Sequence, residues 1–412
     1  MTQLGVGIIG CGYIATSYLG LAPLFKALNP VAVADINMDA AHARAAEYGV
    51  RADTVDDLLK APDVDVIVNL TIPAVHFEVT KRILEAGKHA YSEKPLVLTL
   101  QEGEELRELA ASKGLLIGSA PDTFLGGAHQ QARAAIDAGD VGRIIGGTCH
   151  VMGHGMEAWH PNPDFFFQPG AGPVLDIGPY YVTNLIQLLG PVKSVTALTT
   201  ATFAERTIGI GPRKGETVPV NTPTNIHALL DFANGATVTL GTSWDVWKHG
   251  HANMELYGET GSLFVPDPNF FGGVVEKSIE GADITALPAW DHPFGVANQD
   301  DLANYRCAGL ADMATAIAEG RAHRCSIDLA VHAVDVMTSI LRAGEERRFI
   351  DLSTTCERPA ALSPDEARAL LAKSPASAAI CALDLRERSV ADFSWPQAAM
   401  MSSPRGVRIG DA

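Results

Sequence analysis

The sequence predicts an α/β fold in two parts, an N-terminal doubly wound parallel sheet and a C-terminal α/β domain with an open, mostly antiparallel sheet. Strand and helix patterns alternate as far as Asp122, which is typical of a parallel sheet with helices on its faces. A glycine-rich turn follows the first strand. Longer β-rich segments then replace the alternation. We therefore expect domains at 1–122 and 123–358, and a C-terminal extension rich in Ala, Ser and Pro at 359–412.

Local signals justify each element of the first domain. Short apolar runs indicate buried strands, and longer amphipathic runs indicate helices. Gly49 and Gly87 close two of the helices. The expected strands lie at 6–10, 31–35, 64–71, 89–95 and 115–122. The expected helices follow the first strand to about Leu28 and then lie at 38–49, 55–62, 76–87 and 100–114.

A helix at 126–139 leads into the second domain. Asn234 and Gly235 stand between two apolar runs and predict a hairpin. The expected β-rich segments lie at 144–154, 192–203, 225–246 and 253–266, and two further helices at 309–320 and 327–344. The C-terminal extension has the pattern of one short helix.

Composition narrows the class of protein. The net charge is −17, whereas nucleic acids and anionic membranes require a basic surface, so neither is expected as a partner. None of the six cysteines forms a CxxC pair, which argues against a zinc ribbon and against a redox dithiol. Scattered thiols and an apolar strand starting near Leu4, with no basic segment before it, favour a cytoplasmic location.

The glycine turn "GIIGCGYIA" predicts a Rossmann nucleotide site. Gly10 permits the tight turn, and Gly12 lets the backbone approach a pyrophosphate at the helix N-terminus, beside Tyr13 and Ile14. Asp35 ends the second strand, where a carboxylate binds ribose hydroxyls and repels a 2′-phosphate. The predicted cofactor is NAD. The alternative is an ordinary βα turn with no nucleotide.

Polar residues follow the next strands at the edge where a doubly wound sheet binds its ligands. The segment "TIPAVH" ends the third expected strand and "EKP" the fourth. We expect the residues of these strand ends to border the cofactor, namely Thr71, Pro73, His76, Glu93, Lys94 and Asp122. Lys94 would point its ammonium into the cleft beside the nicotinamide, although a surface lysine is the more common outcome.

The chain resembles the glucose–fructose oxidoreductase, inositol dehydrogenase and rhizopine-catabolism (Gfo/Idh/MocA) family over about residues 4–358. The resemblance lies in the order and spacing of five segments: "GIIGCGYIA", "VAVAD", "TIPAVH", "EAGKHAYSEKPL" and "GPVLDIGPYY". The resemblance implies catalytic roles for Lys94 and Asp176 and substrate binding by both, with Asp176 also contacting Lys94. It also implies a homodimer or homotetramer, often formed through the open sheet.

The family motif Asp-x-Gly-x-His is similar to "DIGPY" except that Tyr180 stands in the histidine position. The resemblance implies that Tyr180 binds substrate and acts as acid or base, as in the glucose–fructose oxidoreductase branch. A free phenol ionises near pH ~10, so a tyrosine used as a base near neutrality needs a nearby cation, for which Lys94 is the candidate. A purely steric or hydrogen-bonding role is the alternative. Tyr181 is expected to pack inside the helix.

Aromatic and polar residues are concentrated at 153–170, a composition that suits the C–H faces and hydroxyls of a sugar ring. We expect Trp159, His160 and Asp164 to line the substrate pocket, with weaker signals at His154, Glu157, Trp247 and His249. The set His150, His154, Glu157 and His160 resembles metal ligands on a helix, but Gly153, Gly155 and Pro161 argue against a helix, so no metal is expected.

The function expected from these residues is NAD-dependent oxidation of a ring hydroxyl in a sugar, polyol or glycoside, with proton transfer by Lys94 or Tyr180. One alternative is an NAD-dependent glycosidase, which oxidises the ring transiently, eliminates the aglycone and regenerates the cofactor. A second is a non-catalytic NAD-binding sensor, although the presence of both Lys94 and Asp176 speaks against it.

Overall fold

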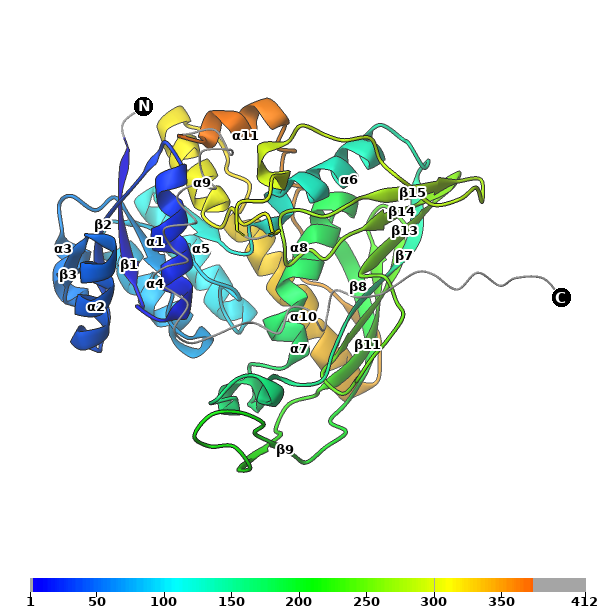
Figure 1. The fold of residues 1–412 in the computed structure, drawn as a ribbon, viewed down its shortest axis with the longest axis horizontal. Coiled ribbons are helices and arrows are strands. Elements are labelled where there is room, and N and C mark those ends of the chain that lie inside the picture. The colour runs from blue at the N-terminus through cyan, green and yellow to red at the C-terminus, as the bar shows by residue number, and fades with distance from the viewer. Residues whose placement is uncertain (1–2, 300, 373–412) are drawn as a thin grey trace.

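A computed structural model describes residues 3–299 and 301–372. Two sheets stand on opposite sides of a group of helices (Figure 1). The N-terminal sheet is parallel, and the second sheet is larger and mixed. In the described part of the chain, no helix combines the length and apolar character needed to span a membrane.

The N-terminal sheet has the strand order β3-β2-β1-β4-β5-β6, with every pair parallel. This order places β1 and β4 side by side at the point where the chain reverses direction across the sheet, and such a switch point forms the ligand crevice of a doubly wound fold. The strands are β1 (Leu4–Ile9), β2 (Leu28–Ala34), β3 (Arg51–Asp53), β4 (Val66–Asn69), β5 (His89–Ser92) and β6 (Ile117–Ser119).

Helices α2 to α5 begin and end close to the residues that the sequence indicates, but α1 ends at Leu21 and not near Leu28, because the chain turns at Ala22–Leu24, which includes Pro23, and β2 begins at Leu28. Asn37 accepts a hydrogen bond from the Asp39 backbone N–H at the start of α2, and Gly49, with φ 70°, ends that helix. The helices are α1 (Tyr13–Leu21), α2 (Met38–Tyr48), α3 (Val55–Lys60), α4 (His76–Glu85) and α5 (Leu100–Lys113).

Among the described residues, nine strands form the second sheet, in the order β16-β15-β14-β13-β7-β12-β11-β8-β17. Its pairs are antiparallel except for β7 and β12, which are parallel and therefore end at the same edge. The predicted Asn-Gly hairpin is confirmed between β11 and β12. The strands are β7 (Ile144–Met152), β8 (Val192–Thr200), β11 (Asn225–Phe232), β12 (Thr237–Ser243), β13 (Met254–Gly258), β14 (Gly261–Val265), β15 (Glu276–Ile279), β16 (Thr285–Ala286) and β17 (Ile350–Asp351).

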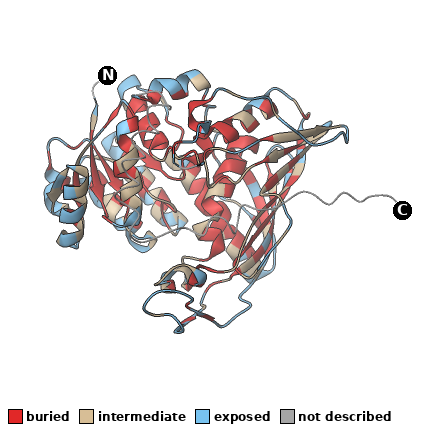
Figure 2. Ribbon diagram, viewed as in Figure 1, coloured by how far each residue is buried: buried red, intermediate tan, exposed pale blue. Residues whose placement is uncertain are grey.

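Buried helices join the two sheets (Figure 2). Helix α10 contacts β8 of the second sheet and also α5 and β6 of the first domain. One continuous hydrophobic core therefore runs through both domains. The helices of the second domain are α6 (Gly127–Asp137), α7 (Pro173–Asp176), α8 (Gly178–Leu189), α9 (Ala308–Glu319) and α10 (Ile327–Glu346).

Two exposed leucines, Leu198 on β8 and Leu229 on β11, lie on the second sheet. The resemblance places the oligomer contact on this sheet. The oligomeric state stays a prediction.

The short strands were not predicted. They are the edge strands β3, β16 and β17, the strand β15 next to an edge, and the separate pair β9 (Glu205–Thr207) and β10 (Thr217–Pro219). Part of the expected extension is folded: α11 (Pro364–Leu370) leads into residues that pair with Phe25, and the Ala372 N–H donates to the Leu24 carbonyl. The rest of the extension lies outside the described residues.

Candidate active site

The glycine turn between β1 and α1 has the shape that a pyrophosphate requires. Gly10 has φ 105°, and a Cβ there would stand 2.6 Å from the Leu70 carbonyl oxygen, so only glycine fits. A Cβ at Gly12 would have no atom within 4 Å, which leaves open space above the turn. Gly12 precedes α1 without a side-chain cap, and the first N–H groups of the helix are available to an anion.

Asp35 is fixed beside this turn. Its carboxylate accepts hydrogen bonds from the backbone N–H of Cys11 at 2.7 Å and of Asn37 at 2.8 Å. Ile36, the next residue, is 97% exposed and offers no cation. On the neighbouring helix, Arg44 donates to the Cys11 carbonyl at 3.3 Å and pairs with Glu47. An acid at the end of β2 beside an open glycine turn fits the ribose of NAD.

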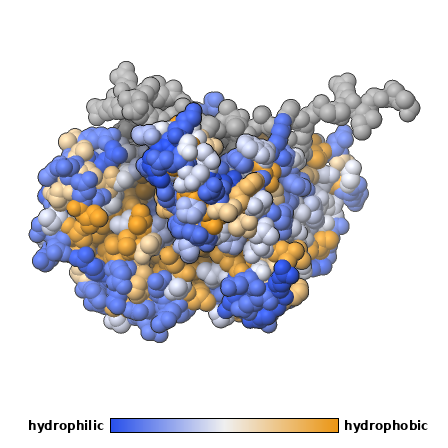
Figure 3. Space-filling view, turned by 90° about the horizontal axis from the view of Figure 1, so that it is seen from below, coloured by the Kyte–Doolittle hydropathy of each residue, from blue (hydrophilic) through white to orange (hydrophobic). Residues whose placement is uncertain are grey.

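Large apolar side chains are exposed after the ends of three strands that are neighbours in the sheet. Tyr13 follows β1, Ile36 follows β2, and Ile72 and Val75 follow β4. Figure 3 shows apolar surface gathered on the side of the molecule that holds this domain. Such surface is suited to the flat faces of the adenine and nicotinamide rings.

His76 lies behind the crevice. Its ring is 1% exposed and bridges two loops, with Nδ1 2.7 Å from the Pro95 carbonyl oxygen and Nε2 3.0 Å from the Thr71 carbonyl oxygen. Burial lowers the pKa of His76. The ring thereby links the "TIPAVH" and "EKP" segments. Direct contact of Thr71, Pro73 or His76 with the cofactor stays a prediction.

Lys94, Asp176 and Tyr180 meet where the two domains join. The Lys94 Nζ donates to the Asp176 backbone carbonyl at 2.7 Å and to Asp176 Oδ1 at 3.0 Å. The same nitrogen lies 5.4 Å from the centre of the Tyr180 ring. An ammonium, a carboxylate and a phenol from three separate segments thus share one site, as expected from the sequence.

The charge on Lys94 is strongly held. Burial alone would lower its pKa, but the neighbouring Asp176, Tyr180 and Glu93 raise it above its ordinary value. Lys94 is therefore suited to act as a fixed cation and hydrogen-bond donor.

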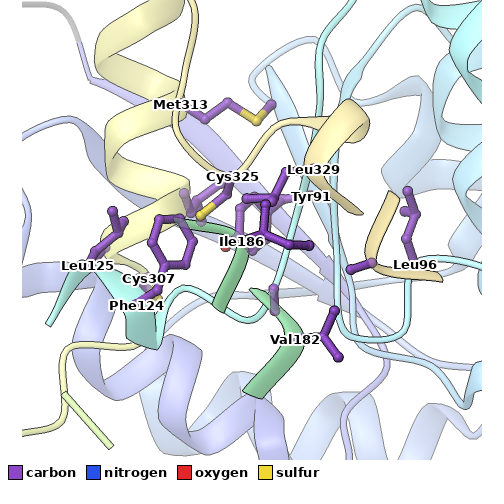
Figure 4. Packing of buried hydrophobic residues seen from close by; sticks show 14 of the residues in the cluster. Tyr91, Leu96, Phe124, Leu125, Val182, Ile186, Cys307, Met313, Cys325 and Leu329 are labelled. Carbon is purple, nitrogen blue, oxygen red and sulfur yellow. The ribbon is translucent and has the colours of Figure 1, made fainter. Parts of the chain in front are cut away.

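The packing of α8 explains why these side chains converge. Tyr91 and Leu96 stand on either side of the "EKP" segment, and the core that contains them also holds Val182 and Ile186 of α8 (Figure 4). Tyr180 lies in the first turn of the same helix. A Cβ at Gly178 would approach the Met337 sulfur to 3.3 Å, which allows α8 to lie close to α10. The prediction that Tyr181 is structural is confirmed, since its ring is completely buried.

Glu93 and Asp122 support the site from the first domain. Glu93 accepts a hydrogen bond from the Tyr18 hydroxyl at 3.0 Å. Asp122 is 2% exposed and accepts from the Gly309 N–H at 3.0 Å. Burial raises the pKa of Asp122 to about 6, although Gly309 and Arg306 act in the opposite direction. Contact of Asp122 with a cofactor stays a prediction.

Arg306 is a site residue that sequence reasoning missed. It precedes α9, far along the chain from the recognised motifs, yet it lies close enough to Tyr180 for the two side chains to interact electrostatically. Burial alone would lower the pKa of Arg306, but Tyr180, Asp122 and Glu93 raise it. "NYRCAG" has no spacing that would have marked it.

Aromatic side chains of the segment 153–170 form a compact cluster. Trp159 and His160 pack edge to face, with ring centres 5.5 Å apart, and both contact Phe166. Asp164 makes a bidentate ion pair with Arg213, which lowers the pKa of Asp164. This carboxylate therefore already has a partner within the protein. Contact of these three residues with substrate stays a prediction.

Of the residues weighed as metal ligands, His154 and Glu157 face each other, with His154 Nε2 3.8 Å from Glu157 Oε1, and each also has a further partner. His150 stacks on His251 at 3.9 Å, and His154 stacks on Trp247 at 3.5 Å. Glu157 is bonded to Arg206 at 3.1 Å. Within residues 3–299 and 301–372, no three His, Cys, Asp or Glu side chains are grouped to hold a metal ion.

Two family models match the chain. The model for the oxidoreductase family with an NAD-binding Rossmann fold matches residues 4–120, and the GFO/IDH/MocA C-terminal domain matches residues 129–264. Together they cover more than half of the sequence. This chain belongs to the GFO/IDH/MocA oxidoreductase family. The N-terminal domain is accordingly an NAD-binding Rossmann domain, and the predicted fold is confirmed.

Individual members of the GFO/IDH/MocA family share about a quarter to a third of their residues with this chain over the aligned parts. An uncharacterized oxidoreductase of Schizosaccharomyces pombe is 33% identical over 147 residues, which are 35% of this chain and 39% of that protein. Levoglucosan dehydrogenase of Pseudarthrobacter phenanthrenivorans is 25% identical over 64% of this chain and 73% of its own length. A solved levoglucosan dehydrogenase without ligand superimposes with a TM-score of 0.74 at 22% identity, over 86% of this chain and all of that one.

Proposed function

We propose that this protein oxidises a ring hydroxyl of a sugar, polyol or glycoside and passes the hydride to NAD. The observation that carries the proposal is the position of the Lys94 ammonium. It is bonded to Asp176 at 3.0 Å and lies 5.4 Å from the centre of the Tyr180 ring. Relatives named levoglucosan dehydrogenase and D-glucoside 3-dehydrogenase support a carbohydrate substrate.

The residues divide the chemistry between them. NAD, when bound, accepts the two electrons and the hydrogen of the C–H bond that breaks. Tyr180 in its ionised form takes the proton of the substrate hydroxyl, and the product is a carbonyl. Lys94 donates a hydrogen bond to the substrate oxygen and stabilises its developing negative charge, while Asp176 holds Lys94 in place and binds a neighbouring hydroxyl.

The proposal is tested by incubating the protein with NAD and a panel of sugars, acidic sugars and glycosides. Formation of NADH and release of aglycone are followed together. Accumulation of NADH with an oxidised sugar is the expected result. Release of aglycone without net NADH would instead show the glycosidase reaction, and neither product with any substrate would favour a sensor.

Lys94→Met separates catalysis from cofactor binding. We expect kcat to fall by about 10²- to 10⁴-fold because the oxyanion loses its donor, while NAD still binds. Lys113→Met, at an exposed lysine of α5, is the matched control and should keep full activity. An active Lys94→Met enzyme would contradict the proposed role.

A further inference from the structure

A small lobe beside α7 has a hydrophobic core of its own. The lobe is built from three segments, 153–170, 203–220 and 244–247, and it contains the β9–β10 pair. Figure 1 shows it beyond α7, at the lower edge of the molecule. The buried side chains of its core are separate from the main core, and they are Met156, Phe167, Ile208, Val218 and Trp244. Because the small lobe packs as a separate unit, its position relative to the active site depends on a few contacts.

Arg206, on β9, is the ionic centre of the small lobe. Its side chain is 4% exposed and donates to Glu157 Oε1 at 3.1 Å and to the Trp244 carbonyl at 3.3 Å. It also pairs with the carboxylate of Asp245. Its guanidinium carbon lies 5.8 Å from the centre of the Phe167 ring. One buried cation therefore joins all three segments of the small lobe.

Backbone hydrogen bonds connect this centre to the Lys94–Asp176 pair. Phe167 follows Phe166, whose carbonyl accepts from the Gly172 N–H at 3.0 Å. The Gly172 carbonyl in turn accepts from the Asp176 N–H at 3.0 Å, and the Asp176 carbonyl accepts from Lys94 Nζ at 2.7 Å. The segment 153–170 is thereby held at a defined position relative to Asp176.

Stability alone does not account for a buried ionic network of this kind. Burying charges costs nearly as much free energy as their attraction contributes, so apolar side chains of similar size would hold the small lobe together as well. Among the described residues, the network also contains buried polar atoms without a hydrogen-bond partner, namely His154 Nδ1, Glu157 Oε2 and Arg206 Nε. What paired charges add is one fixed orientation. They hold the side that carries Trp247, which is 81% exposed and stacks on His154 at 3.5 Å.

We propose that Arg206 is a positioning residue, which fixes the small lobe and thereby decides which sugars the active site accepts. This inference rests on the proposed function, because it assigns the small lobe to the substrate side of the site. The three residues expected to line the pocket, Trp159, His160 and Asp164, all belong to the small lobe. Loss of the Arg206 contacts should change substrate binding, whereas NAD binding and hydride transfer depend on other elements.

Steady-state kinetics of Arg206→Lys with NAD and a panel of sugars and glycosides tests the proposal. Lysine keeps the charge but cannot make the forked bonds to Glu157 and Asp245. We expect KM for the preferred sugar to rise roughly 10-fold while kcat changes less than about threefold, because the lost contacts orient the pocket and touch no reacting atom. The ratio of kcat/KM between sugars should change by about 10-fold. Arg143→Met, at an exposed arginine paired with Glu259, is the matched control.

An apolar replacement of the network separates positioning from stability. The triple variant Arg206→Met, Glu157→Leu, Asp245→Leu should keep the free energy of unfolding of the wild type, since no charge is left buried and unpaired. Its sugar preference should still differ from that of the wild type. Recovery of the wild-type preference in this variant, or an unchanged KM and preference in Arg206→Lys, would overturn the inference whatever happens to stability.

Calorimetric titration of the NAD-loaded protein with the same sugars gives a readout without turnover. The Kd of the preferred sugar should rise roughly 10-fold in Arg206→Lys, and the Kd of NAD should stay unchanged. Altered sugar binding in a protein that oxidises no sugar would support the role of Arg206 and reject the proposed function. Sugar oxidation with the same sugar affinities in wild type and variant would do the reverse.

Discussion

At the residue scale, short sequence motifs predict the residues expected to bind the cofactor. They predict only some of the residues around Lys94 and Tyr180. Asp35 and Gly10 can be placed from sequence because a strand, a tight turn and a helix are consecutive in the chain. Arg306 could not be placed, because its partner Tyr180 lies on another element and only folding brings the two together. Likewise, nothing in the spacing of Asp164 indicated that Arg213 would pair with it.

Asp35→Asn should weaken NAD binding. The carboxylate that would accept the ribose hydroxyls becomes a neutral amide, and hydrogen bonds to a charged group are worth about 1.5–3 kcal/mol, which corresponds to roughly a 10- to 100-fold increase in Kd. NADP should bind better than it does to the wild type, because repulsion is removed and Arg44 lies near Cys11. Calorimetric titration with each nucleotide measures both effects. Asp39→Asn, at an exposed acid nearby, is the control, and equal NAD affinity in Asp35→Asn would contradict the assignment.

At the element scale, helix ends and strand order were predictable, whereas the close approach of α9 to the Rossmann sheet was not. The caps at Asn37 and Gly49 are local and visible in sequence. The contact of α9 with β6 depends instead on Gly309, where a Cβ would stand 2.5 Å from the Tyr91 hydroxyl and 2.6 Å from the Cys325 sulfur. The short strands were missed because two to four residues carry too little pattern.

Gly309→Ala should therefore destabilise the protein. The added methyl group must displace buried side chains, and overpacking of this kind costs about 1–3 kcal/mol of the free energy of unfolding. Urea denaturation followed by circular dichroism measures the loss. Gly250→Ala is the control, because a Cβ there meets no atom within 4 Å and should change stability by less than about 0.5 kcal/mol. Equal stability of the two variants would show that the side chains around Gly309 move aside for the methyl group at little cost in free energy.

At the scale of the whole molecule, one core joins both domains, so stability and the geometry of the site depend on each other. Several histidine rings are buried inside the molecule. His332 accepts a hydrogen bond from the Val192 N–H at 3.1 Å, which requires an unprotonated ring nitrogen. Burial lowers the pKa of each of these groups to about 4: His129, His292, His323 and His332.

This arrangement predicts loss of stability in acid. Above pH 6.5 the four rings are neutral in both states, but between pH 6.5 and about 4 the unfolded chain binds protons that the folded chain does not. The free energy of unfolding should therefore fall as the pH is lowered through this interval, by several kcal/mol in order of magnitude. Asp122 and Asp267 act in the opposite direction, because burial raises the pKa of each, but they are two carboxyls against a larger number of buried histidines.

Urea titrations at successive pH values between 7.5 and 4.5 measure this slope. His332→Gln should make it shallower, since the amide oxygen can still accept from Val192 without titrating. His42→Gln, at an exposed position of α2, should leave the slope unchanged. A stability that is constant across the interval would contradict the assignment of neutral buried rings.

The sequence by itself determined the fold class and the NAD-binding turn, and it predicted Lys94, Asp176 and Tyr180 as candidate site residues, because each depends on neighbours within one strand–turn–helix unit or on a motif of a few residues. Tertiary structure alone decided that Lys94 bonds to Asp176 and that Arg306 lies close to Tyr180. The physical reason is distance along the chain: such contacts arise when α8, α9 and α10 pack between the two sheets, and packing depends on the shapes of all the buried side chains at once.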